Sequence, residues 1–96
     1  DQEAEANIEI VHTGASERVG KMGEINLDTI CENYDNDEIV NVDTLKERRL
    51  ISPKVAKIKV LARGVMTKRL TVVASKFSIQ AVKMITLAGG KAELED

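Results

Sequence analysis

The residues of this chain that could take part in catalysis or metal binding are few and scattered. His12 is the only histidine and Cys31 the only cysteine, and neither has neighbours at the spacing of a metal site. We expect His12 at the surface and Cys31 in the core as a small apolar residue. The sequence contains no glycine-rich phosphate loop and no assignable Ser–His–Asp order. It therefore predicts no enzyme, no metal and no cofactor.

Three acidic residues close together, Asp35, Asp37 and Glu38, superficially resemble a cation-binding loop. A calcium loop also needs a central glycine and a distal glutamate, and both are missing. We interpret this segment as a solvated turn.

Charge is distributed very unevenly along the sequence. Residues 1–45 carry twelve acidic and two basic residues, whereas residues 46–96 carry twelve basic and four acidic ones. Between Arg48 and Lys91 there are eleven Lys or Arg residues and no acidic residue. Such a block favours a polyanionic partner. The alternative is a solvated face balanced by the acidic half of the same fold, and charge alone leaves both interpretations open.

If the partner is RNA, it should be bound through its phosphates. Tyr34 and Phe77 are the only aromatic residues, and modules that bind single strands need several aromatic rings on which bases stack. Lys and Arg side chains on phosphates, and recognition by shape, remain as the means of binding.

The sharpest candidates are the pair Lys68-Arg69 and Lys76, which precedes a helix expected to begin at Ser78. A helix N-terminus presents free N–H groups to an anion, although Ser78 could simply cap the helix and Lys76 simply be solvated. The predicted RNA-binding residues are Arg48, Arg49, Lys59, Arg63, Lys68, Arg69 and Lys76.

The first elements that could position these residues form an internal repeat. Residues 25–30 (Ile-Asn-Leu-Asp-Thr-Ile) recur as residues 40–45 (Val-Asn-Val-Asp-Thr-Leu). In each copy we expect a brief strand, then a short helix capped by Asp28 or Asp43. Two units of this size should stack on each other to bury their apolar faces.

The later elements follow from apolar spacing and from breakers. Pro53 should end the second helix, and strands are expected at 58–62 and 70–74. A helix should run from Ser78 to Gly89-Gly90, followed by a short edge strand at 91–94. We expect one core that includes Val60, Val72, Phe77 and Ile85. The 96 residues thus predict a small single α/β domain, an irregular stack of short strand–strand–helix units with a C-terminal helix and a final short strand.

Several of these segments also resemble a known family. Leu70-Thr71-Val72, Lys76-Phe77-Ser78 and Ala88-Gly89-Gly90-Lys91 are similar to the C-terminal signature of ribosomal protein L-fifteen of the bacterial large subunit. Val42-Asp43-Thr44-Leu45-Lys46 fits the same family. The resemblance runs from about Gly23 to Glu95.

The resemblance implies a structural constituent of the large ribosomal subunit that binds large-subunit rRNA and neighbouring ribosomal proteins in the cytoplasm. It implies no membrane contact and no small-molecule substrate. Residues 23–96 would be the C-terminal globular domain. Residues 1–22 match the family poorly and are expected to be partly disordered, and the family's basic N-terminal extension would lie upstream.

The sequence departs from the family pattern in having additional apolar residues. Val73, Ile79, Val82 and Met84 stand where the family usually has polar or charged residues. Extra apolar surface on a small domain indicates a protein contact or weak solubility. The alternative function is therefore a protein-interaction module that keeps the fold and binds a protein partner through its last helix.

Overall fold

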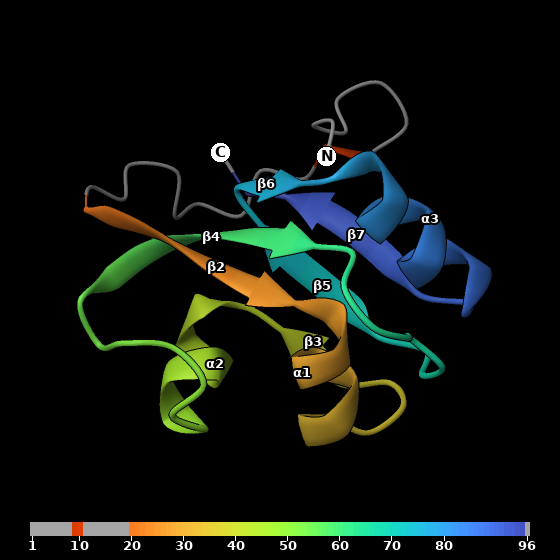
Figure 1. Cartoon of the computed structure of the whole chain (residues 1–96), viewed down its shortest axis with the longest axis horizontal. Coiled ribbons are helices and arrows are strands. Elements are labelled where there is room, and N and C mark those ends of the chain that lie inside the picture. The colour runs from red at the N-terminus through yellow and green to blue at the C-terminus, as the bar shows by residue number, and fades with distance from the viewer. Residues whose placement is uncertain (1–8, 11–19, 96) are drawn as a thin grey trace.

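The chain alternates between two parallel β-sheets in the computed structural model, which describes residues 9–10 and 20–95 (Figure 1). One sheet has the order β2-β4-β6, with β2 at Lys21–Asn26, β4 at Val55–Leu61 and β6 at Lys76–Phe77. The other has the order β1-β7-β5-β3, with β1 at Glu9–Ile10, β3 at Ile39–Val40, β5 at Thr71–Ala74 and β7 at Lys91–Leu94. The helices are α1 (Leu27–Asn33), α2 (Val42–Glu47) and α3 (Ile79–Leu87).

From β2 to β7, consecutive strands alternate between the two sheets. Strands two apart in chain order therefore become neighbours, and the described strand pairs are all parallel. This arrangement is a stack of strand–strand–helix turns, so the predicted α/β fold class is confirmed.

The core lies between the two sheets and is built from residues in register. Partner residues of parallel strands point to the same side of their sheet, so equivalent positions of successive turns stack in rows. The four residues expected to share the core belong to one buried cluster, which confirms that prediction. The two central rows are Ile25, Val60 and Phe77 in one sheet and Val40, Val72 and Ala92 in the other.

The repeat of residues 25–30 and 40–45 gives a strand followed by a helix in both copies, but the predicted caps are wrong. The N-cap residues are Asn26 and Asn41, while Asp28 and Asp43 already lie in the first turn. The Oδ1 atom of Asn41 accepts a hydrogen bond from the Thr44 amide at 2.8 Å, and the Thr44 hydroxyl accepts one from the Asn41 amide at 3.0 Å. Asn26 makes no side-chain capping bond. The N-cap is the residue with extended backbone just before the helix, and Asn26 and Asn41 have that backbone. Asp28, inside the first turn, accepts a hydrogen bond from the next amide, that of Thr29, at 2.7 Å.

The second helix and the last strand also differ from the predictions. The helix ends at Glu47, well before Pro53, because Arg49 adopts a left-handed backbone with φ of 59°. Strand β7 is not an edge strand, since it pairs with β5 on one side and with β1 on the other. The prediction for His12 and most of those for residues 1–22 lie outside the described residues, although β2 begins at Lys21.

The last helix is capped as predicted. The Ser78 hydroxyl accepts a hydrogen bond from the Ala81 amide at 3.2 Å, and Gly89, just after the helix, has φ of 91°. Its inner stripe is buried, with Ala81 and Ile85 at most 1% exposed.

The predicted extra apolar surface is wrong. Val73 and Val82 are buried, and Ile79 and Met84 pack against the core, because α3 contacts both β4 and β7. Of the large apolar residues of α3, Leu87 is the exposed one. Apart from Leu87, the large apolar residues of the last helix therefore pack inside the domain. In residues 9–10 and 20–95, no helix has the length and apolarity needed to span a membrane.

Candidate nucleic-acid interface

The outer face of the three-stranded sheet carries a group of lysines, here called the basic sheet face: Lys57, Lys59 and Lys76. Strand β4 buries Ile58 and Val60, so the alternating Lys57 and Lys59 point to the opposite side. Lys76 is the register partner of Lys59 in the parallel pair β4–β6. The register therefore places two positive charges at directly opposed positions of the sheet.

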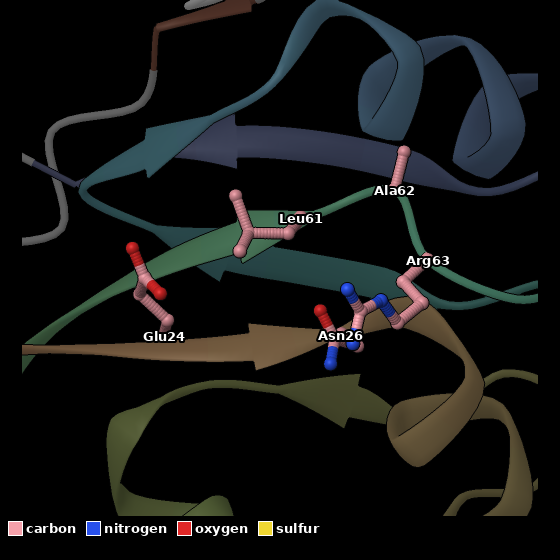
Figure 2. Close-up of a pocket in the computed structure, with 5 residues that line it drawn as sticks. All are labelled: Glu24, Asn26, Leu61, Ala62 and Arg63. Carbon is pink, nitrogen blue, oxygen red and sulfur yellow. The ribbon is translucent and has the colours of Figure 1, made fainter. Parts of the chain in front are cut away.

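A hollow of about 370 Å³ continues this face toward the carboxyl ends of β2 and β4. Figure 2 shows its lining, in which the Arg63 guanidinium turns back from the end of β4 toward the Asn26 amide. Asn26 and Leu61 are register partners, as are Glu24 and Lys59. Glu24 is exposed and is the only acidic residue in the three strands. The five lining residues are Glu24, Asn26, Leu61, Ala62 and Arg63.

Three of the predicted RNA-binding residues instead contact the acidic turn, defined as residues 33–38. Arg48 is the first: its Nη2 atom lies 2.6 Å from Glu38 Oε2, and Nη1 donates to the Asn33 carbonyl oxygen. The hydrogen bond from Arg48 holds the pKa of the Glu38 carboxyl below its usual value. Burial raises the pKa of Tyr34, whose hydroxyl lies 2.7 Å from the Thr44 hydroxyl. Arg48 thus has carboxylate and carbonyl partners within the chain.

Lys68 and Arg69 hold the same turn from the other side. Lys68 Nζ donates to the Tyr34 carbonyl oxygen at 2.6 Å. The Arg69 guanidinium forms a two-point contact with Asp37, Nε to Oδ1 at 2.7 Å and Nη2 to Oδ2 at 2.8 Å. These hydrogen bonds lower the pKa of the Asp37 carboxyl. The solvated turn predicted from the sequence is therefore also an ion-pairing site for the basic half.

The structure divides the predicted residues into separate groups. Lys59 and Lys76 are brought together, and Arg63 lies at the hollow that continues their face. Arg69 precedes β5 and Lys76 follows it, so these two lie at opposite ends of that strand. Arg49 is exposed on the turn after α2, at a second hollow lined by Lys46, Arg49, Leu50, Ile51, Ser52 and Pro53.

Sequence reasoning missed Lys57 and Asn26. The signal for Lys57 was present, because lysines alternate with buried residues in Lys57-Ile58-Lys59-Val60. Nothing in the sequence distinguishes Asn26 from Asn41, its counterpart in the repeat.

Two further observations concern possible metal ligands and the thiol of Cys31. Among residues 9–10 and 20–95, no group of three or more His, Cys, Asp or Glu side chains could hold a metal ion. Cys31 is buried, as predicted, and its Sγ atom lies 3.4 Å from the Thr67 hydroxyl. That hydrogen bond lowers the pKa of the thiol despite its burial.

Comparison with known proteins gives one consistent family. The family model described as "Ribosomal proteins 50S-L15, 50S-L18e, 60S-L27A" matches residues 24–93. Large ribosomal subunit protein uL15 of Phytoplasma australiense is 40% identical over 74 residues, which are 77% of this chain and 50% of that protein. The uL15 proteins of Agathobacter rectalis and Fervidobacterium nodosum are 43% and 41% identical over 70 residues, each covering 73% of this chain and 47% of the relative. The chain thus spans about half the length of the curated relatives it matches.

Proposed function

We propose, since the chain belongs to the family of ribosomal proteins 50S-L15, 50S-L18e and 60S-L27A, that it is a structural constituent of the large ribosomal subunit and binds large-subunit rRNA. It acts without catalysis and without a cofactor, on cytoplasmic ribosomes, next to other ribosomal proteins. The similarity to uL15 proteins of the large ribosomal subunit supports the ribosomal assignment.

The observation that carries the RNA contact is the register of Lys59 with Lys76 on the outer face of the sheet. With Lys57 on the same face and Arg63 at its end, several cations face one direction. A backbone of phosphates meets such a face by charge and shape, without reading base sequence. The proposed contact is therefore the basic sheet face together with Arg63.

Three of the other predicted RNA-binding residues have a different role, which is to hold the acidic turn in place. Arg48 and Arg69 each make a close ion pair with a carboxylate of the acidic turn, and Lys68 binds a carbonyl oxygen of the same turn. A guanidinium already held by a carboxylate attracts a phosphate less strongly, because the local charge is balanced. We assign these three residues mainly to holding the turn.

The experiment is a salt titration of binding to a labelled fragment of large-subunit rRNA, followed by fluorescence anisotropy. If about four phosphates are contacted, log affinity should fall with log salt at a slope of roughly −3 to −4. The double variant Lys59→Gln/Lys76→Gln should make the slope shallower by nearly two.

The matched control is Lys83→Gln/Lys91→Gln, which removes the same charge from exposed positions outside the three-stranded sheet. It should leave the slope close to the parent value. Binding that does not depend on salt would overturn the RNA contact. Equal effects of the two double variants would overturn its placement on the sheet face.

A further inference from the structure

The hollow at the end of the basic sheet face has a lining that differs in kind from a phosphate-binding surface. It contains a carboxylate (Glu24), an amide (Asn26) and a guanidinium (Arg63) around the half-buried side chains of Leu61 and Ala62 (Figure 2). Its volume of about 370 Å³ falls within the range of small-molecule sites. Such a mixture of one apolar wall and a few polar groups suits a nucleobase better than a bare phosphate.

Glu24 is the group that a phosphate-binding face does not explain. Its negative charge lies beside Lys59, where it would repel a phosphate backbone. A carboxylate accepts hydrogen bonds from the amino and imino groups of bases, which phosphates do not offer. Guanine presents two parallel N–H donors, at N1 and at the 2-amino group, and a carboxylate can accept both.

The side chain of Asn26 is a second, independent indication that the hollow binds a ligand. Its counterpart in the repeat, Asn41, uses its side-chain oxygen to cap α2. Asn26 occupies the same position before α1, yet it makes no side-chain capping bond and its amide lines the hollow. The amide is therefore available to a ligand, and its N–H groups can donate to a base carbonyl such as guanine O6.

We propose that this hollow receives a single unpaired base of the bound RNA, with guanine preferred. Glu24 accepts from the guanine N–H groups, Asn26 donates to the base carbonyl, and Leu61 and Ala62 cover part of the base. Arg63 binds the phosphate of the same nucleotide. This inference rests on the proposed function in that the base belongs to an RNA held by the basic sheet face, and it adds a position at which base identity matters.

The test uses mononucleotides as probes, so that it does not depend on the contact with the sheet face. GMP, IMP and UMP are titrated separately into the isotopically labelled chain, and the amide signals of Glu24, Asn26 and Leu61 are followed by NMR. GMP should perturb these signals most. IMP lacks the 2-amino group and should bind more weakly, and UMP should bind most weakly.

Two variants assign the roles. Glu24→Gln should weaken GMP binding by about fivefold or more and IMP binding by less, because a good two-point base contact is worth at least that factor. Arg63→Gln should weaken all three nucleotides alike. Both positions are exposed, so neither change should unfold the domain. Glu32→Gln and Lys83→Gln, at other exposed positions, are the controls and should have no effect.

The two proposals fail in different ways. Salt-dependent binding of the rRNA fragment without nucleotide binding in the hollow would overturn the base pocket and leave the proposed function standing. Perturbation by GMP without binding of the rRNA fragment would overturn the proposed function and leave the hollow as a site for a guanine nucleotide only. UMP binding as tight as GMP binding, or GMP affinity unchanged by Glu24→Gln, would also overturn the pocket.

Discussion

The guanidinium carbon of Arg48 lies 3.9 Å from the centre of the Tyr34 ring, over its face. The same guanidinium holds Glu38 and the carbonyl oxygen of Asn33. One side chain from the end of α2 therefore fixes both the ring that follows α1 and the turn that leads to β3. Cation–π contacts of this kind add to the ion pair, since the ring face attracts the same cation.

This cluster predicts an acid-sensitive part of the domain's stability. The pKa of Glu38 is lowered in the folded state, chiefly by its hydrogen bond with Arg48. A lowered carboxyl pKa contributes stability above the unfolded-state pKa, and this contribution is lost as pH falls through the folded-state pKa. Urea unfolding midpoints should fall with acidification below about pH 5, and Glu38→Gln should make that fall less steep. Identical pH profiles for the two proteins would contradict this interpretation.

The repeat predicts unequal roles for two equivalent asparagines. Asn41→Ala removes a side-chain cap and should lower the free energy of unfolding by about 1 kcal/mol, within a range of roughly 0.5–2. Asn26→Ala removes no capping bond and should cost clearly less. Chemical denaturation of both variants provides the measurement. Equal losses would mean that the capping box at α2 is not what stabilises that helix.

Among the core residues, Phe77 should contribute strongly to the free energy of unfolding. Its side chain is fully buried and lies in register with Val60. Phe77→Ala should cost about 3–5 kcal/mol, enough to unfold much of so small a domain. Leu87→Ala, at an 87% exposed position of α3, should stay within about 0.5 kcal/mol of the parent. Thermal unfolding followed by circular dichroism would compare the two, and a mild effect of Phe77→Ala would show that the core tolerates its loss.

The two glycines after α3 should differ in their tolerance of a side chain. Gly89 has a positive φ, but a Cβ atom there would make only ordinary van der Waals contact with the Arg69 side chain, at 3.6 Å, so Gly89→Ala should cost only about 1–2 kcal/mol. A Cβ atom on Gly90 would lie 2.1 Å from the Leu70 carbonyl oxygen, which is backbone and cannot move aside alone. Gly90→Ala should therefore be the more destabilising change in denaturant unfolding. The reverse order would indicate that strand β7 can shift relative to β5.

Local signals in the sequence were sufficient for the elements whose ends are set by side chains. Ser78 and Gly89 bound the last helix as expected, and the repeat correctly predicted two strand–helix units. The end of α2 was not predictable in the same way, since it depends on Arg49 adopting a left-handed backbone before Pro53 is reached. The sequence predicts β7 as an edge strand, because its partner β1 lies at the other end of the chain.

In the candidate site, too, local sequence patterns group some residues correctly but do not reveal contacts that depend on the tertiary structure. Adjacent residues such as Lys68 and Arg69 are easily grouped from the sequence, yet the acidic turn holds both of them. The pairing of Lys59 with Lys76 depends on the register between β4 and β6, which local patterns do not encode. The sequence predicts Val82 and Met84 as exposed apolar surface, because local patterns do not show which strands pack against α3.

The parallel arrangement of the strands also has a consequence for how the domain comes to be folded. Parallel neighbours cannot be joined by a tight hairpin, so each described pair must close a loop that contains other elements. The extreme case is β1, where Glu9 pairs with Glu93 and Ile10 with Leu94. Topologies dominated by such distant contacts fold slowly, because chain entropy is lost before the contacts form. During synthesis β1 is therefore made long before β7, its partner among the described strands.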